Sequence, residues 1–304
     1  MARQPDPPAK PFLKWAGGKS QLIDEIGRRF PFKTNDKFTY VEPFVGGGAI
    51  LFWVLNKFPK IEKAVINDLN SDLVCTYQII KSSVERLIKR LAAWEKNYHK
   101  YIDDPDGRRT CYNKMRDRFN RRSSKPLTQA ALMIFLNKTG FNGLYRVNRN
   151  NGFNVPIGNY RTPLICNRKN LRATSKALQK VKILNGDFEK TVIHVGKNAF
   201  FYFDPPYKPL SSTSNFNTYA KGGFDDREQE RLKDFCDLLN ERGCKWALSN
   251  SDVAAADPAN TFFDDLYSQY RISRVWAKRS INSNPARRGK LTELLITNDN
   301  YKKR

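Results

Sequence analysis

Short apolar runs alternate along the chain with longer stretches in which apolar residues recur at helical spacing. The apolar runs predict strands at residues 40–45, 63–68, 182–187, 199–204, 245–250 and 291–298. The helical spacing predicts a helix that begins near Leu22 and further helices at 49–58, 71–100, 168–180 and 225–242. Such an alternation of strand and helix is typical of a doubly wound α/β sheet.

A strongly basic segment interrupts this alternation. Residues 81–180 hold 23 lysines and arginines against six acidic residues, and so carry +17 of the net charge of +24. The segment stays helix-like over about 100–137, and Asn151-Gly152 then lies between two short alternating stretches, which predicts a hairpin at about 144–158. Charge so concentrated favours a polyanionic partner, because each neutralised phosphate releases counterions. A solvated surface is the alternative.

The basic segment also suggests how the chain is divided. Residues 1–11 are predicted to form a flexible leader. Residues 12–80 together with 181–304 are predicted to form a catalytic domain, and 81–180 a separate module that reads the polyanion.

Several classes of protein are excluded by the same sequence. The longest apolar run, Ala49 to Leu55, is far shorter than the roughly 20 residues that span a bilayer, and no signal peptide is visible. Five scattered cysteines form no C-x-x-C pair, which predicts reduced thiols in a cytoplasmic protein and no metal site. "GGKS" at 17–20 resembles the end of a nucleotide-hydrolysing P-loop, but Leu13 stands where that pattern needs its first glycine.

A run of three glycines, Gly46-Gly47-Gly48, follows the first predicted strand and precedes a helix. Glycines at such a point let the backbone come close to a ligand at a helix N-terminus. Asp68 ends the next predicted strand, where a carboxylate can accept both hydroxyls of a ribose. Leu51 stands where the dinucleotide fingerprint needs its third glycine, so the pattern indicates either an adenosine-type cofactor or a tight structural turn.

The stretch "FYFDPPY" at 201–207 carries the strongest chemical signal. An apolar strand ends in Asp204, and the two prolines that follow stiffen the chain because each fixes φ near −65°. An aspartate oxygen and the Pro205 carbonyl, held close together, suit a group with two protons to donate, such as the exocyclic amine of a base. Tyr207 offers a face on which a planar base can stack.

These residues together describe methyl transfer to a base amine. The amine is a poor nucleophile because its lone pair is delocalised into the ring, and two acceptors on its hydrogens free that lone pair. The predicted electrophile is the sulfonium methyl group of S-adenosylmethionine, placed in line. The nitrogen becomes acidic once it is alkylated, so the reaction needs no strong base and no metal.

From Phe12 almost to its C-terminus, the chain resembles the Dam-type DNA adenine-N6 methyltransferases of the alpha group, the D12 class. The resemblance is carried in matching order by "FLKWAGGK", "VEPFVGGGA", "INDLNSDL", "GFNGLYRVN", "FNVPIGNY", "NGDF", "YFDPPYKPLS", "FNTYAKGGF", "LSNSD" and "RSINSN". It implies a doubly wound mixed sheet, Rossmann-like, with an inserted helical and hairpin target-recognition domain. It also implies S-adenosylmethionine as cofactor and N6 of a flipped-out adenine, usually within GATC, as the acceptor.

The resemblance assigns roles to residues of this chain. Asp204, Pro205, Pro206 and Tyr207 would hold the flipped adenine, and either Phe216 or Tyr219 would cover its other face. The residues implied at the methyl donor are Trp15, Ala16, Gly17, Lys19, Phe44, Gly46, Gly48, Asp68, Asp187 and Phe188. Among them, Lys19 would meet the carboxylate end of the donor and Asp68 its ribose.

The resemblance also implies double-stranded DNA as the partner. Lys14 would read a guanine at the edge of the site, and the hairpin residues that would replace the departing base and read its neighbours are Phe141, Asn142, Leu144 and Arg146. Asn159 stands where related sequences often carry arginine. Neither a membrane nor an obligate protein partner is indicated, and a cognate restriction nuclease is left open. The alternatives are adenine methylation of another DNA sequence or of RNA, and a non-catalytic DNA-binding protein on the same fold.

Overall fold

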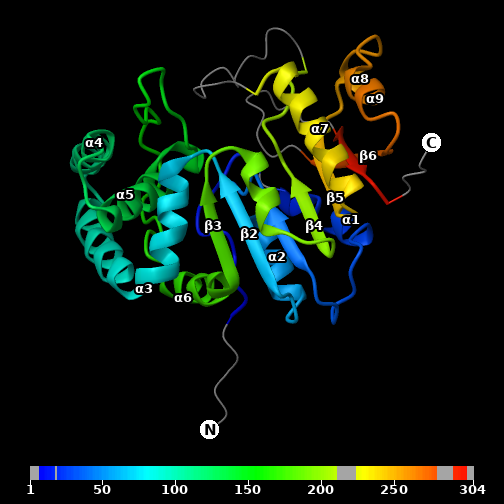
Figure 1. Ribbon diagram of the computed structural model, residues 1–304. Helices are drawn as coiled ribbons and strands as arrows, with labels where there is room; N and C mark the ends of the chain where they lie inside the picture. Colours follow the sequence, from blue (N-terminus) through cyan, green and yellow to red (C-terminus); the bar gives the residue numbers. More distant parts are fainter. Residues whose placement is uncertain (1–6, 18, 211–223, 279–289, 300–304) are drawn as a thin grey trace. The chain divides into compact units, whose positions relative to one another are not determined.

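A mixed β-sheet forms the frame of the protein (Figure 1). The computed structural model describes residues 7–17, 19–210, 224–278 and 290–299. The seven strands in these ranges follow the order β3-β2-β1-β4-β5-β7-β6. Their bounds are β1 Thr39–Glu42, β2 Lys63–Asp68, β3 Val181–Asn185, β4 Ala199–Phe203, β5 Lys245–Ser251, β6 Arg271–Lys278 and β7 Lys290–Thr297. The β1–β2, β1–β4 and β4–β5 pairs are parallel, whereas β7 runs antiparallel to β5 and β6. The predicted doubly wound mixed sheet is confirmed.

Helices connect these strands. The α-helices are α1 Ile23–Arg28, α2 Ala49–Lys57, α3 Ser71–Tyr98, α4 Pro105–Asn120, α5 Pro126–Thr139, α6 Arg168–Ala177, α7 Asp226–Glu241, α8 Val253–Ala256 and α9 Phe262–Leu266. Short 3₁₀ turns lie at η1 Lys19–Gln21, η2 His99–Tyr101, η3 Phe141–Gly143, η4 Leu178–Lys180 and η5 Phe188–His194. The predicted helices near 22 and at 49–58, 71–100, 168–180 and 225–242 are therefore confirmed to within a few residues.

The stretch 100–137, predicted to be helix-like, is confirmed and holds two helices. Asp104 caps α4, and Pro105 and Pro126 each begin a helix. Between them Arg122 adopts a positive φ of 54°, which no continuing helix allows. The strand β6 was not predicted at all. The hairpin is present as two antiparallel bridges, Gly140↔Ile157 and Val147↔Phe153.

The chain packs into two units. The first comprises Met1–Gly18, Gly46–Lys57 and Asp68–Gly186. Its core is the apolar face of α3 against α5, and α5 is buried along almost its whole length from Thr128 to Leu136. Within the predicted leader, Ala9 is buried and Lys10 exchanges two hydrogen bonds with the Asn170 side chain.

The second unit comprises Lys19–Val45, Phe58–Asn67 and Asp187–Arg304. All five residues of β4 are buried, as expected for a strand covered on both faces. Phe30, Phe58 and Phe200 pack together at ring-centroid distances of 4.5 to 4.6 Å. The Asp225 carboxylate accepts from the Glu228 amide and so begins α7.

Candidate functional site

In the second unit, the corner after β4 brings a carboxylate and a lysine together. The strand stops at Phe203, and Asp204 follows with its side chain 22% exposed. Lys19 Nζ lies 2.9 Å from Asp204 Oδ1 and is itself 8% exposed on its side chain. The lysine of the "GGK" sequence therefore meets a protein carboxylate, and the two form a largely buried, charge-assisted hydrogen bond.

The charge on Asp204 is set by opposing effects. Burial raises the pKa of the Asp204 carboxyl, because an apolar environment disfavours the ionised form. The Lys19 ammonium pulls this pKa down, and the nearby Glu293 carboxylate pushes it up. The net direction is upward, so Lys19 is the group that opposes the uptake of a proton by Asp204.

Tyr207 completes this cluster. Its hydroxyl donates to Glu293 Oε2 over 2.7 Å, and Lys19 Nζ lies 4.3 Å from the centroid of its ring. Burial, together with the charges of Asp204 and Glu293, raises the pKa of Tyr207 well above its usual value, so the phenol stays protonated and serves as a donor. Sequence reasoning missed Glu293, although a single carboxylate in the apolar strand "LTELLITN" is a signal for a partnered site. Phe216 and Tyr219 lie outside the described residues.

Buried amides hold the proline corner in place. Gln229 on α7 donates to the Pro206 carbonyl over 3.1 Å, and Asn250 on β5 donates in turn to Gln229 Oε1 over 3.1 Å. Asn250 Oδ1 also accepts from the Lys208 amide over 3.2 Å. Gln229 and Asn250 are almost fully buried, so these bonds are shielded from competing water. The "LSNSD" sequence thus supports the corner from the neighbouring strand.

Two further donor-site predictions, Asp187 and Phe188, lie beside an arginine in the same unit. Arg231 donates to both carboxylate oxygens of Asp187, over 3.1 and 2.7 Å, and its guanidinium carbon lies 4.3 Å from the Phe188 ring centroid. Burial alone would raise the pKa of Asp187, but the hydrogen bonds from Arg231 and the Glu189 amide lower it. Phe44 is half-buried with its ring centroid 5.4 Å from that of Phe188.

In the first unit, the glycine run accommodates two aromatic side chains. Gly46 and Gly48 have positive φ angles of 47° and 73°. A Cβ at Gly46 would lie 2.9 Å from the Trp15 ring, and one at Gly48 would lie 2.5 Å from the Tyr77 hydroxyl oxygen. That hydroxyl donates to the Gly46 carbonyl over 3.0 Å. The glycines are thus needed for the protein's own packing, in addition to the two roles considered from the sequence, an adenosine-type cofactor site or a tight turn.

Asp68 is oriented by the same glycine run. Its carboxylate accepts from the Gly46 amide over 3.0 Å and from the Asn70 amide over 2.9 Å. Burial raises the pKa of Asp68, whereas these amides and that of Leu69 lower it, and the net direction is upward. The residue as a whole is half-buried. Ala16 and Gly17 are both exposed, and Gly17 has a φ of 77°.

The predicted DNA-reading residues lie around the turn and the hairpin of the first unit. Phe141 is 49% exposed, and Asn142 beside it is exposed with a φ of 53°. Arg146 is exposed and donates to both the side chain and the carbonyl of Asn154, over 2.8 and 3.2 Å, which fixes its direction on the hairpin. Leu144 is half-buried.

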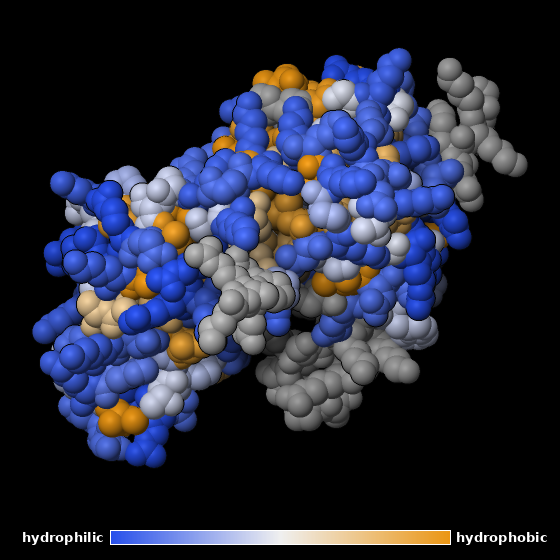
Figure 2. All heavy atoms as spheres, turned by 90° about the horizontal axis from the view of Figure 1, so that it is seen from below, coloured by the Kyte–Doolittle hydropathy of each residue, from blue (hydrophilic) through white to orange (hydrophobic). Residues whose placement is uncertain are grey.

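Large apolar side chains reach the surface in separate places. Figure 2 shows small hydrophobic patches scattered among hydrophilic side chains on the face that it presents. The exposed large apolar residues in the described ranges are Leu69, Phe141, Leu164, Ile193, Leu238 and Trp276. In the described helices no segment is long and apolar enough to cross a membrane, and the described side chains contain no group of three potential metal ligands.

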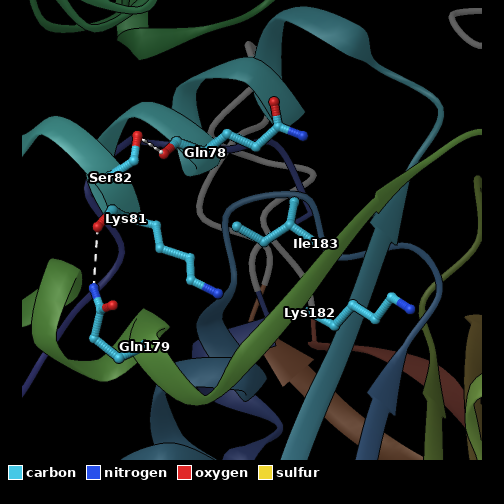
Figure 3. A pocket seen from close by; sticks show the side chains of 6 residues that line it. All are labelled: Gln78, Lys81, Ser82, Gln179, Lys182 and Ile183. Carbon is cyan, nitrogen blue, oxygen red and sulfur yellow. Dashed lines mark hydrogen bonds between the residues drawn. The ribbon is translucent and has the colours of Figure 1, made fainter.

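A pocket of about 450 Å³ lies in the first unit between α3 and β3 (Figure 3). The residues that line it are Gln78, Lys81, Ser82, Gln179, Lys182 and Ile183. The Lys81 ammonium donates to the Val181 carbonyl over 2.7 Å, and the Gln179 amide donates to the Lys81 carbonyl over 3.0 Å. None of the predicted site residues lines this pocket.

The chain is similar to a family model and to several known proteins over most of its length. The family model for D12 class N6 adenine-specific DNA methyltransferases matches residues 15–281. The Type II methyltransferase M.MjaIII of Methanocaldococcus jannaschii is 44% identical over 294 residues, which cover 95% of this chain and 99% of the relative. The Type II methyltransferase M1.LlaDCHI of Lactococcus lactis subsp. cremoris is 38% identical, with 95% of each chain covered. The DNA adenine methylase of Haemophilus influenzae is 36% identical, covering 94% of this chain and 92% of the relative.

Proposed function

The chain belongs to the D12 class of N6 adenine-specific DNA methyltransferases, and from this premise we propose that it methylates N6 of a flipped-out adenine within GATC, with S-adenosylmethionine as the donor. The observation that carries the proposal is the Asp204–Lys19 pair at a rigid proline corner, beside the Tyr207 ring. The relative named as a DNA adenine methylase supports adenine in DNA as the acceptor, and GATC is the target that the resemblance of the sequence implies.

The corner residues supply what the amine requires. Asp204 Oδ and the Pro205 carbonyl accept hydrogen bonds from the two N–H groups of the amine, which frees the nitrogen lone pair to attack. Lys19 favours the ionised form of Asp204, in which both carboxylate oxygens are acceptors. When the N–CH₃ bond forms and the S–CH₃ bond breaks, the nitrogen becomes acidic and its proton leaves to Asp204 or to water.

Tyr207 positions the base. Its hydroxyl donates to Glu293, which anchors the tip of the side chain, and the Lys19 ammonium lies over one ring face. We assign the opposite face to stacking with the extruded adenine. Pro206 contributes stiffness, because its carbonyl is already bonded to Gln229.

The donor-binding residues of the proposal are those that the resemblance of the sequence implies: Trp15, Ala16, Gly17, Lys19, Phe44, Gly46, Gly48, Asp68, Asp187 and Phe188. When bound, the donor supplies an electrophilic methyl group on a sulfonium. The Asp68 carboxylate suits this group, since two backbone amides orient its oxygens, which can also accept from ribose hydroxyls.

The DNA-binding residues of the proposal are Lys14, Phe141, Asn142, Leu144 and Arg146. Phe141 is exposed at a turn, where it can fill the space left by the extruded base. Arg146 presents a guanidinium that Asn154 holds in a fixed direction, as base reading requires. The +17 of residues 81–180 supplies the phosphate-binding charge.

The test is methyl transfer from labelled S-adenosylmethionine to matched substrates: a GATC duplex, duplexes with one base pair of the site replaced, single-stranded DNA and RNA. We expect label on adenine N6 of the GATC duplex, identified by chromatography of the digested nucleosides. Equal labelling of the altered duplexes would refute GATC as the target, and labelling of RNA above DNA would refute the substrate class. Asp204→Ala is the inactive control.

A further inference from the structure

Asn137 near the end of α5 joins two separate segments of the first unit through one side chain. Its Oδ1 accepts from the Lys14 amide over 2.9 Å. Its Nδ2 donates to the Lys14 carbonyl over 2.8 Å and to the Gly143 carbonyl over 2.6 Å. The residue is 4% exposed, so both protons and one acceptor position of the amide are used away from solvent.

The two segments both carry predicted DNA-reading residues. Lys14 lies directly before Trp15, outside any helix or strand, and Gly143 ends the turn that holds Phe141 and Asn142. The Lys14 stem passes so close to Gly143 that a Cβ there would lie 2.6 Å from Lys14 Cδ. Beyond it, Lys14 Nζ lies 3.4 Å from the Tyr160 hydroxyl. The course of the Lys14 side chain is therefore defined from its backbone to its tip.

We propose that Asn137 is a specificity-determining positioning residue, whose amide holds Lys14 and the Phe141–Gly143 turn in one register so that they address neighbouring base pairs. This inference rests on the proposed function, because it assigns Asn137 to the reading of a DNA site by these residues. Asn137 is buried and touches no base itself. It acts through Lys14, and its loss is expected to change which base pairs are distinguished.

Two other asparagines make the same two-bond contact and provide matched controls. Asn170 accepts from the Lys10 amide over 3.0 Å and donates to the Lys10 carbonyl over 2.9 Å. Asn120 does the same with Phe153, over 2.8 and 3.0 Å. Of these three clamps in the described part of the chain, Asn137 is the one whose side chain also bonds another segment, at the Gly143 carbonyl. Substitution of Asn170 or Asn120 therefore removes a clamp and leaves the link between Lys14 and Gly143 intact.

The substitution Asn137→Asp changes the bonding with little change in shape. The carboxylate can still accept from the Lys14 amide, but it cannot donate to the carbonyls of Lys14 and Gly143. Its charge would face both carbonyl oxygens, which repels them. The turn and Lys14 are then expected to separate, and Lys14 should lose its defined direction toward the DNA.

The experiment measures DNA binding, so it does not depend on turnover. Fluorescent duplexes with GATC, or with one base pair replaced, are titrated with the full chain and its Asn137→Asp, Asn170→Asp and Asn120→Asp variants. We expect Asn137→Asp to lose about tenfold in discrimination at the edge guanine, within the range of a single base contact, while the two controls keep the wild-type ratio. Urea unfolding midpoints identify any variant that is merely destabilised.

A double-variant comparison separates positioning from a general structural role. If Asn137 acts through Lys14, Asn137→Asp adds no further loss of discrimination to Lys14→Ala. Equal effects of the Asn137 and Asn170 variants, or additive losses with Lys14→Ala, would overturn the inference. Wild-type protein that binds GATC selectively but transfers no methyl group would refute the proposed activity and leave this inference standing.

Discussion

The Lys19–Asp204 pair leads to a specific expectation for Lys19→Met. Lys19 Nζ and Asp204 Oδ1 are 2.9 Å apart, and both side chains are mostly buried. A charge-assisted hydrogen bond of this kind is worth about 1.5–3 kcal/mol, whereas an exposed ion pair is worth less than about 1 kcal/mol. Removal of the ammonium leaves burial and Glu293 to act on the carboxyl, and both raise the pKa of Asp204. The variant should therefore take up a proton at a pH where the wild type remains ionised.

The sign of the effect on activity follows from the role of Asp204 as an acceptor. A protonated carboxyl has lost part of its capacity to accept from the amine, so the acidic limb of the pH–rate profile should move to higher pH in Lys19→Met. At a pH where Asp204 is protonated in the variant but ionised in the wild type, the loss of about 1.5–3 kcal/mol corresponds to a rate lower by roughly 10- to 150-fold. The loss should shrink as the pH rises and Asp204 ionises.

The assay is single-turnover methylation of the duplex over a range of pH, with saturating donor. Lys233→Met is the matched control, because Lys233 is also mostly buried and lies 2.6 Å from Asp237 in the same unit. The control should keep the wild-type profile, and Lys19→Arg should restore most of it. An equal loss of rate at every pH in Lys19→Met would refute the reasoning, since it would mean that Lys19 does not act through the ionisation of Asp204.

Three further expectations follow from the site. Asp204→Ala should abolish methyl transfer while the affinity for duplex DNA, measured by titration, stays within a few-fold of the wild type. Arg146→Ala should lose about 1–3 kcal/mol of discrimination against near-cognate sites with little change in non-specific binding, and unchanged preference would show that Arg146 reads no base. Gly48→Ala should lower the free energy of unfolding in urea by about 1 kcal/mol or more, because φ is 73° and the new Cβ would lie 2.5 Å from the Tyr77 hydroxyl oxygen. Tyr77→Phe should recover part of this loss, and no recovery would refute the clash.

Two of the strands predicted from sequence, β2 and β4, have long buried runs. Every residue of β4 is buried, and β2 is buried from Ala64 to Asn67, so their runs are continuous. The strand β6 lies at the end of the strand order and carries Arg271, Arg274 and an exposed Trp276. In a strand with exposed positions such as these, charged residues interrupt the apolar run, and the sequence pattern then resembles that of a loop.

The helices of the basic segment were predicted without their boundaries. The segment was predicted to be helix-like over about 100–137, and the structure holds two helices there, each with a proline, Pro105 or Pro126, in its first turn. The signal for the first boundary is present in the sequence, with Asp104 as a capping residue directly before Pro105.

The sequence predicted the consecutive residues of the site but not the distant residues that support them. Asp204 to Tyr207 are consecutive, so a motif captures them, and their chemistry could be argued from residue types alone. The residues that hold them come from elsewhere: Glu293 is 86 positions from Tyr207, and Gln229 is 23 from Pro206. No spacing rule links a carboxylate in β7 to a tyrosine after β4, because their proximity arises from the order of strands in the sheet.

Glu293 also shows why the supporting residues determine how the corner works. A phenol at this depth needs a hydrogen-bond acceptor, and Glu293 provides one at 2.7 Å. The same carboxylate adds negative charge near Asp204, which raises the proton affinity of the acceptor that the amine must meet. Lys19 then has two tasks, to offset this charge and to lie over the Tyr207 ring. The motif supplies the reactive groups, whereas their protonation and orientation depend on a lysine and a glutamate from distant parts of the sequence.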